Sequence, residues 1–387
     1  MSNRLLVVSE RHEIEVPRII AHLDMDAFFA AIEERDTPAF RGVPLVVGAD
    51  PLGGKGRGVA STSNYPARAY GIHSATPISV AWRLSEAARR AGKPPVIFVS
   101  VDMQKYARVS EKVMRIVRRF IPSMEQASID EVYGDVSWTG SYEKAERVCH
   151  HLKTEIHSEE QLTASIGLGP NKLIAKIASG WRKPNGLTIV REEEAEAFLA
   201  PLSIRVIPGI GPKTEDMLNA TNIKIITDLR ALPLHQLEAM LGKRGVDLYE
   251  KVRGRDDSPV EEYSEPKSIG EQETFEFDTL DSHMLLSQLD GLVRGVMDRL
   301  HREEFHSFRT VVLTIRFADF VTTSRTHTLA RATGEPAILR REAMKLMLPF
   351  LDRRENPHRK LIRLLGLRVE KLSCEMNRVG LFDGLLS

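Results

Sequence analysis

The chain has 387 residues, a formal net charge of +1 and two cysteines. This length exceeds one ordinary hydrophobic core, so we expect two to four domains, and the near-neutral charge argues against a uniformly basic nucleic-acid binder. Cys149 and Cys374 exclude a disulfide framework and lack zinc-site spacing. Because no apolar run reaches membrane-spanning length and the first residues lack a signal-peptide core, we expect a cytoplasmic protein that binds no membrane.

Charge is distributed unevenly along the chain. Residues 281–387 contain 18 Lys and Arg against 13 Asp and Glu, whereas residues 256–265 are acidic. A basic C-terminal part fits a surface that faces phosphate groups, although a solvated helix face would give the same counts.

The first predicted core element begins at Ile19. Residues 1–18 precede it, and we assign them no function, whether they form an arm or an additional edge strand over residues 5–8. The apolar run from Ile19 ends in two acids, Asp24 and Asp26, and then changes to helical spacing, which predicts a buried strand followed by a helix. The two acids, two apart on a strand, would share a face. They indicate a metal site, with strand-end acids that face water as the alternative.

A second polar group follows a short buried strand over residues 44–48 and a Gly-rich surface hairpin over residues 49–58. Thr62, Tyr65 and Arg68 are spaced three apart at the start of a helix. Arg can donate two hydrogen bonds to an anion, and the helix dipole favours negative charge there. The spacing therefore predicts a polyanion site, with an ordinary capped helix and an exposed Arg as the alternative.

A second pair of acids, Asp130 and Glu131, lies in residues 127–136, which alternate like a strand. Neighbours on a flat strand point to opposite faces, so both can serve one site only at a turn or bulge between paired strands. Magnesium needs oxygen ligands from several parts of a chain. Together with the acids near residue 24, this pair predicts a shared cation site.

Two further helix starts are predicted downstream. A strand over residues 162–167 leads into a helix that begins near Lys172. Residues 206–214 contain Gly209 and Gly211 between helical segments, and such a turn exposes backbone N–H groups that can bind a DNA phosphate without reading its sequence. This pattern predicts a helix-hairpin-helix, with a plain helical turn as the alternative.

The C-terminal part follows a polar, proline-containing linker and has the order β-α-β-β-α-β of a split βαβ motif. The predicted elements are strand 268–277, helix 283–304, strand 308–317, strand 322–331, helix 336–351 and strand 361–372. Alternation over residues 309–316 leaves one face apolar for the helices and the other polar for a ligand. The candidate phosphate contacts, each equally explained as a solvated arginine, are Arg309, Arg316, Arg325 and Arg331.

The succession of these motifs resembles the Y-family DNA polymerases, specifically the DinB or DNA polymerase IV branch. The resemblance rests on residues 24–29 and 128–131 and extends from about Ile19 to Leu372. It implies an α+β, multidomain right-hand polymerase. The implied parts are an N-terminal extension (1–18), palm (19–30 and 96–182), small fingers (31–95), a helical thumb with the helix-hairpin-helix (183–253), a linker (254–267), a βαββαβ little finger (268–373) and a tail (374–387).

The resemblance also implies roles for the polar residues. Asp24, Asp130 and Glu131 would be catalytic and, with the Met25 carbonyl, would bind two Mg²⁺ ions, which Mn²⁺ could replace; Asp26 belongs to the motif, but the family's ligand is the first aspartate. The residues implied to hold the nucleotide triphosphate are Thr62, Tyr65, Arg68 and Lys172. Lys176, one turn on, is equally explained as a surface cation.

Further positions follow the family's pattern. Phe29 would be the steric gate that leaves no room for a 2′-hydroxyl, while Phe28 would serve packing. Val59 and Ser61 would lie over the nascent base pair. The implied DNA contacts are Gly209, Gly211, Lys213 and the four arginines named above. Val132 and Gly134 depart from the family's Ala-Tyr-Leu-Asp sequence and could alter packing beside the metals.

The implied function is that of a low-fidelity translesion DNA polymerase. It would add dNTPs to a primer 3′ end by two-metal-ion phosphoryl transfer, without a proofreading exonuclease, in DNA repair and damage tolerance. We expect a monomer whose partners are primer-template DNA and dNTP. The tail around Leu381 and Phe382 resembles a short sliding-clamp motif but lacks its usual leading Gln.

Two alternatives belong to other classes. A DNA-bound scaffold could have kept the fold, although retention of the whole acidic and triphosphate set argues against it. A nucleotidyl cyclase also uses two carboxylates on a similar palm, but the helix-hairpin-helix and the C-terminal domain would then be unexplained.

Overall fold

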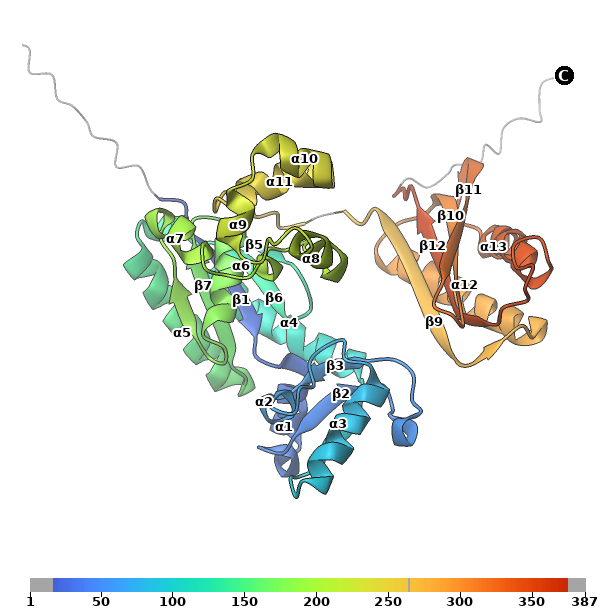
Figure 1. Cartoon of the computed structure of the whole chain (residues 1–387), viewed down its shortest axis with the longest axis horizontal. Helices are drawn as coiled ribbons and strands as arrows, with labels where there is room; N and C mark the ends of the chain where they lie inside the picture. The colour runs from blue at the N-terminus through green and yellow to red at the C-terminus, as the bar shows by residue number, and fades with distance from the viewer. Residues whose placement is uncertain (1–16, 264, 375–387) are drawn as a thin grey trace, which may run out of the picture. The chain divides into compact units, whose positions relative to one another are not determined.

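The computed structural model describes residues 17–263 and 265–374 (Figure 1). The chain divides into two compact units, residues 1–263 and 264–387. The possible strand over residues 5–8 and the tail around Leu381 and Phe382 lie outside the described residues. Within the described ranges, no helix combines the length and the apolar character that crossing a membrane requires.

The first unit is built on a five-stranded sheet with β1 (Ile20–Met25) at its centre. The strand order is β5 (Met124–Gln126), β6 (Glu131–Asp135), β1, β7 (Ala164–Gly169), β8 (Leu187–Ile189). β1 pairs antiparallel with β6 and β7, and β8 pairs parallel with β7. The range that we predicted as thumb therefore contributes one strand, β8, to this sheet.

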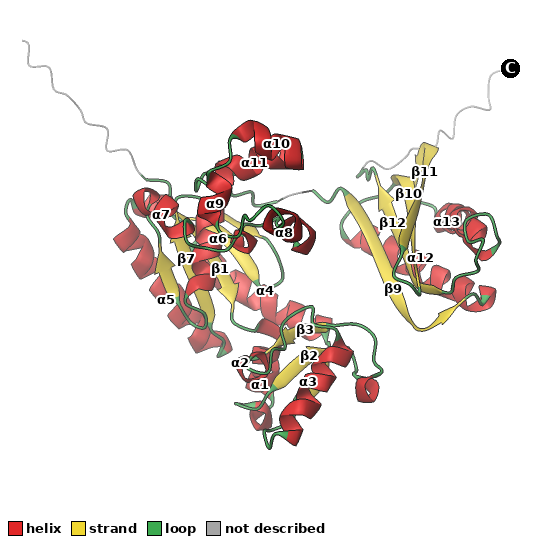
Figure 2. Ribbon diagram, viewed as in Figure 1, coloured by secondary structure: helices red, strands yellow, loops and turns green. Residues whose placement is uncertain are grey.

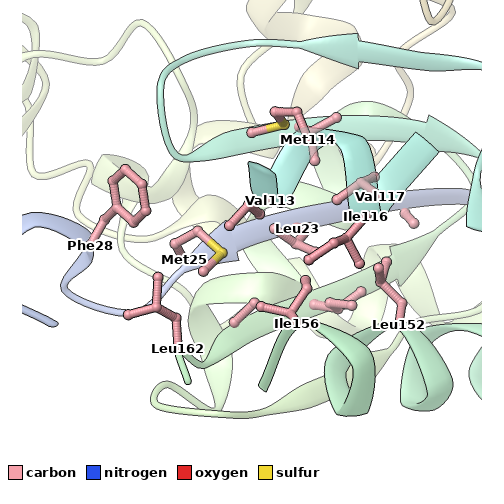
Figure 3. Packing of buried hydrophobic residues seen from close by; sticks show 14 of the residues in the cluster. Leu23, Met25, Phe28, Val113, Met114, Ile116, Val117, Leu152, Ile156 and Leu162 are labelled. Carbon is pink, nitrogen blue, oxygen red and sulfur yellow. The ribbon is translucent and has the colours of Figure 1, made fainter. Parts of the chain in front are cut away.

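Both faces of β1 are covered, which explains its nearly continuous burial. Leu23 and Met25 lie in a core with side chains of α4 (Met103–Phe120) and α5 (Tyr142–Glu160), as Figure 3 shows. His22 faces the other way and hydrogen-bonds Ser179 of α6 (Lys172–Trp181), with 2.8 Å between His22 Nδ1 and Ser179 Oγ. The alternation directs Asp24, two residues on, towards the same side as His22.

A smaller sheet lies between β1 and α4 in the sequence. Its order is β3 (Ala60–Ser63), β2 (Leu45–Gly48), β4 (Ile97–Ser100), and the helices of this region are α1 (Phe28–Asp36), α2 (Tyr65–Arg68) and α3 (Ile78–Arg90). The Gly-rich segment joins β2 to β3 as predicted. Gly56 is required in it, because a Cβ there would lie 2.0 Å from the Asp50 carbonyl oxygen.

Short helices follow β8, and all of them except the first, η4 (Glu192–Glu194), pack against α6 in one hydrophobic core. They are η4 (Glu192–Glu194), α7 (Ala195–Leu199), η5 (Ile204–Val206), α8 (Pro212–Asn219), α9 (Ile226–Arg230), α10 (Leu234–Leu241) and α11 (Lys243–Lys251). The α6 side chains in that core are Leu173, Ile174, Ile177 and Ala178, so one helix joins the central sheet to this helical part.

The second unit confirms the predicted β-α-β-β-α-β order (Figure 2). Its elements are β9 (Ser268–Thr279), α12 (Ser282–Arg302), β10 (Phe308–Phe317), β11 (Thr322–Thr333), α13 (Pro336–Leu351) and β12 (Ile362–Glu370), and the antiparallel sheet has the order β11-β10-β12-β9. Val311, Leu313 and Ile315 pack with both helices. The other face of β10 and β11 carries mainly hydroxyl side chains, such as the bonded pair Thr314 and Ser324.

Candidate active site

Three acids lie where the end of β1 runs beside the start of β6. The register places Asp24 directly opposite Glu131, so their Cβ atoms are about 5 Å apart. Asp130 lies in the turn between β5 and β6, where Ser128 Oγ accepts the N–H groups of Asp130 (3.2 Å) and Glu131 (3.0 Å) and lies 2.6 Å from Asp130 Oδ1. This turn satisfies the condition under which two sequence neighbours can serve one site.

Two lysines contact these carboxylates. Lys183 donates a hydrogen bond to Asp24, and Lys176 Nζ lies 2.7 Å from Glu131 Oε1. Burial raises the pKa of Asp24 to about 6, an effect that Lys183 partly opposes. Lys176, for which a surface position was an equal explanation, therefore belongs to the acidic site.

The acids offer only oxygen donors, which fit a hard divalent cation such as Mg²⁺. In the part of the chain that the structure describes, however, no three acidic, His or Cys side chains are close enough together to hold a metal ion. Lys176 contacts Oε1 of Glu131 and Lys183 contacts Oδ1 of Asp24, so a cation at these acids would compete with two ammonium groups for carboxylate oxygens.

Asp26 has a different role from Asp24. β1 ends at Met25, and the Asp26 carboxylate accepts hydrogen bonds from Thr163 Oγ1 (2.8 Å), Ser165 Oγ (2.8 Å) and the Asn185 N–H (2.7 Å). With three donors and 3% exposure, this carboxylate stabilises the fold and is not free to bind a cation. The Asp26 carboxylate still lies on the Asp24 side of the sheet, because its donor Ser165 stands directly opposite Asp24 in the register.

The predicted polyanion residues lie at β3 and α2. The Arg68 guanidinium stacks over the Tyr65 ring at 4.7 Å, and its Nε donates to the Ser63 carbonyl (3.0 Å). Burial, followed by the charge of Asp26, raises the pKa of Tyr65 to about 12. The buried Tyr65 hydroxyl has no hydrogen-bond partner of normal geometry within the described ranges, so it can donate to an anion. Thr62 belongs to the same strand end.

Lys172, the fourth residue predicted to hold the triphosphate, has different neighbours from Tyr65 and Arg68. Its Nζ is 2.7 Å from both carboxylate oxygens of Glu125, 4.8 Å from the centre of the Tyr133 ring and 3.3 Å from the Pro259 carbonyl oxygen. Its partners therefore belong to β5, β6 and the segment after α11. The lysine that contacts Asp24 is Lys183. It lies in the loop after α6, where no periodic pattern in the sequence predicts the direction of a side chain.

The two phenylalanines of α1 differ as expected. Phe28 is 1% exposed and packs in the core (Figure 3). Phe29 is half-buried, and its ring is stacked on Tyr106, with 4.3 Å between the ring centres and 11° between the planes. Val59 is 45% exposed, and Ser61 is half-buried on β3.

Val132 and Gly134 of β6, which depart from the family's pattern, face the core. Val132 is 2% exposed, and a Cβ at Gly134 would lie 2.5 Å from Ile121. Both departures therefore adjust packing between β6 and the residue that follows α4, and neither changes the carboxylates.

Comparison with known proteins decides the family. Residues 23–180 match the impB/mucB/samB family, residues 266–380 its C-terminal domain, and residues 205–256 the thumb domain of DNA polymerase-iota. DNA polymerase IV 2 of Methanosarcina mazei is 41% identical over 356 residues, which are 92% of this chain and 92% of that protein. The chain belongs to the Y-family DNA polymerases, in the DNA polymerase IV branch.

Solved structures of the Y family agree with this assignment. A Y-family DNA polymerase chimera of Dbh and Dpo4 superposes with a TM-score of 0.80 at 27% identity, over 92% of this chain and 99% of the chimera. An insertion ternary complex of Dbh DNA polymerase gives a TM-score of 0.62 at 27% identity, over 92% of this chain and 100% of that one. The α+β, multidomain fold expected from the sequence is thus confirmed.

The hairpin of this Y-family chain joins η5 to α8. Gly209 has a φ of +97°, and Gly211 precedes α8 without a side-chain cap, which leaves the first N–H groups of that helix free of side-chain acceptors. Arg205 braces the turn through the Ile210 carbonyl oxygen (3.1 Å) and Glu215 (3.3 Å). Lys213 lies in the first turn of α8.

The arginines of the second unit do not share one face. Arg316 pairs in register with Thr322 on the hydroxyl-bearing face, and its Nε lies 2.9 Å from Thr322 Oγ1. Arg325 pairs with Leu313, whose side chain lies in the core, and its guanidinium bonds to Glu355. Arg309 donates to the Leu329 carbonyl (3.0 Å), and Arg331 is exposed on β11.

One arginine of the hydroxyl-bearing face was not singled out from the sequence. Arg368 pairs in register with Val312, four residues before Arg316 on β10, and it is exposed. Strand parity places it on the same face as Arg316. The alternation of side chains along the predicted strand 361–372 was the signal that could have identified Arg368.

Proposed function

We propose that this chain is a low-fidelity translesion DNA polymerase, which adds dNTPs to a primer 3′ end under the direction of a template and without proofreading, in DNA repair and damage tolerance. The observation that carries the proposal is that Asp24 of β1 stands opposite Glu131 of β6, with Asp130 in the turn directly before β6. Membership of the DNA polymerase IV branch supports it.

In this proposal the acids hold divalent cations. Asp24, Asp130, Glu131 and the Met25 carbonyl would bind two Mg²⁺ ions, with Mn²⁺ as a possible replacement, since all these donors are oxygens. When bound, the ions stabilise negative charge on the attacking and leaving oxygens. Ser128 holds the Asp130 carboxylate in place through its hydroxyl.

The remaining residues bind and orient the nucleotide. Tyr65 and Arg68 would donate to the triphosphate, and Lys183 and Lys176 would exchange their carboxylate partners for phosphate oxygens. The primer 3′-hydroxyl then attacks the α-phosphorus of the dNTP, a new phosphodiester bond forms, and pyrophosphate leaves. Phe29 excludes the 2′-hydroxyl of a ribonucleotide. We retain Thr62, Val59 and Ser61 as nucleotide and base-pair contacts.

The proposed partners are primer-template DNA and dNTP, in agreement with the insertion ternary complex of the similar Dbh polymerase. We propose that Gly209, Gly211 and Lys213 contact the DNA backbone, together with arginines of the second unit. A monomeric state, residence in the cytoplasm and a clamp contact through Leu381 and Phe382 stay predictions.

Primer extension with Mg²⁺ and dNTPs, on an undamaged template and on one with a minor-groove guanine adduct, tests the function. Extension that continues past the adduct is the expected result. Bound primer-template without extension would favour the scaffold, and cyclisation of a nucleoside triphosphate without primer would favour the cyclase.

Lys183 and Lys172 are predicted to contribute unequally to nucleotide use. Lys183→Ala should lower kcat/KM for dNTP by about thirtyfold, the effect of one lost charge-assisted hydrogen bond, mainly through KM. Lys172→Ala removes a lysine of α6 that pairs with Glu125. Because such an ion pair contributes little, kcat/KM for dNTP should fall less than threefold. Single-nucleotide insertion kinetics measure both, and the reverse order would favour Lys172, the lysine that the family resemblance implies, over Lys183 as the triphosphate lysine.

Arg316 and Arg325 form a matched pair for DNA binding, because they lie on neighbouring strands but face opposite sides of the sheet. Arg316→Ala should weaken primer-template binding and reduce the slope of log Kd against log salt by about one. Arg325→Ala, which removes contacts with Glu355 and the Phe350 ring on the helix-bearing face, should leave that slope unchanged. Fluorescence anisotropy across a salt series measures both slopes. Equal slopes in the two variants would contradict assignment of the DNA to the hydroxyl-bearing face.

A further inference from the structure

Phe29, the proposed steric gate, rests on a second ring. Tyr106 comes from the first turn of α4, is fully buried, and lies almost parallel to Phe29, with 4.3 Å between the ring centres. Two rings in flat contact must tilt together, because a change in the angle of one opens a gap or a clash with the other. The orientation of Tyr106 therefore limits the orientations that Phe29 can take.

Tyr106 is in turn held by an acid of α1. Its hydroxyl donates to Glu33 Oε1 at 2.8 Å, and Lys105 Nζ lies 3.0 Å from the other carboxylate oxygen of Glu33. Burial, followed by the hydrogen bond to Glu33, raises the pKa of Tyr106, so its hydroxyl stays a donor at neutral pH. Both oxygens of Glu33 are thus engaged, and the contact with Tyr106 is charge-assisted.

The gate residue Phe29 and the acid Glu33 both belong to α1. Phe29 and Glu33 are four residues apart and so lie on one face of the helix, as does Asp36, which also contacts Lys105 at 2.9 Å. The same helix face therefore carries the gate ring and the acid that fixes the support of that ring. Glu33 is only 8% exposed, and a buried carboxylate is costly unless it is paired. Neither the proposed cation site nor the triphosphate contacts use it.

We propose that Glu33 is a positioning residue for sugar discrimination. Through its hydrogen bond to Tyr106 it fixes the tilt of the Phe29 ring, and it thereby limits the insertion of nucleotides that carry a 2′-hydroxyl. The inference rests on the proposed role of Phe29 and deepens it. Removal of the Glu33 contact releases the Tyr106 ring, Phe29 gains freedom to tilt, and ribonucleotides enter while deoxynucleotides still fit.

The test measures kcat/KM for insertion of dCTP and of CTP opposite a template guanine by the full chain with Mg²⁺. Glu33→Ala and Tyr106→Phe should each lower the dCTP-to-CTP selectivity about tenfold, because a small displacement of a contact group is enough to change a fit of this kind. The double variant should lose no more than either single variant, since both remove one interaction. Glu33→Gln, which keeps an acceptor, should regain most of the selectivity.

Asp36→Ala is the matched control, because it removes the other α1 carboxylate that binds Lys105 but leaves the Glu33 contact with Tyr106 in place. Its selectivity should equal that of the wild type. A merely structural role for Glu33 would lower kcat/KM for both sugars in proportion and leave the ratio unchanged. If Glu33→Ala does not fold, as thermal unfolding would show, Tyr106→Phe carries the test because it keeps the buried ring.

Two outcomes distinguish the positioning role of Glu33 from the steric-gate role of Phe29 on which it depends. Unchanged selectivity in Tyr106→Phe and Glu33→Ala, with relaxed selectivity in Phe29→Ala, would overturn the role of Glu33 alone. Unchanged selectivity in Phe29→Ala would overturn the gate and the inference together.

Discussion

Replacement of Asp130 and Glu131 by alanine is expected to abolish primer extension and to leave primer-template binding intact. The two carboxylates supply two of the three acidic side chains that lie where the end of β1 runs beside the start of β6. Loss of metal-stabilised charge on the reacting oxygens should cost at least about a thousandfold in kcat. Lys176 loses its partner Glu131, which adds positive potential beside the DNA, so binding should be unchanged or tighter. Primer extension and anisotropy at one salt concentration measure the two effects.

Glu125→Ala is the control for this experiment. Glu125 is an acid of the neighbouring strand β5 that pairs with Lys172 and is not among the proposed ligands. It should keep extension within a few-fold of the wild type. Extension by the doubly substituted chain would contradict the assignment of the cation site, and equal losses in both variants would place the effect in the fold of the sheet.

The order of the elements was predictable wherever the hydrophobic period is clear. Alternation over residues 309–316 fixed which side of β10 meets the helices, and Val311, Leu313 and Ile315 lie in that core. The alternation of side chains along a strand also predicted a turn next to Asp130 and Glu131, because neighbouring side chains on a flat strand point to opposite faces. Such arguments succeed because burial of one face determines register.

The partners of long charged side chains were not predictable in the same way. Lys172 and Lys176 are one turn apart on α6, yet they contact Glu125 and Glu131, which come from strands some 45 residues earlier. Lys183 lies beyond the helix, where no period directs its side chain. Which acid each lysine meets depends on the packing of α6 across the sheet, which the sequence pattern alone does not determine.

Two other positions needed the three-dimensional register. The strand was expected to carry both Asp24 and Asp26, but Ala27 takes a left-handed conformation (φ +47°) that ends β1 and starts α1. The direction of Arg325 was not predictable either, because the register of β11 against Leu313 places it on the face that bears the helices. In the first case a backbone conformation ends the strand, and in the second the strand register decides the face of a charged side chain; the hydrophobic pattern shows neither.

Phe29→Ala is expected to admit ribonucleotides. Phe29 is half-buried, so one face of its ring rests on Tyr106 while the rest can meet a nucleotide. Truncation removes the group that excludes the 2′-hydroxyl and leaves Tyr106 anchored to Glu33, so dNTP insertion should stay within a few-fold of the wild type. The dCTP-to-CTP ratio of kcat/KM should fall by about a hundredfold or more, as for loss of a steric contact that separates two sugars.

Phe28→Leu is the matched control, because Phe28 is the neighbouring aromatic residue of α1 but lies wholly in the core. A smaller side chain there should lower the free energy of unfolding by about 1–2 kcal/mol through lost packing and leave the sugar ratio unchanged. If Phe28→Leu relaxed the ratio as much as Phe29→Ala, discrimination would depend on the general packing of α1. If only Phe29→Ala did so, the selectivity would belong to the one ring that is both supported by Tyr106 and open to the nucleotide.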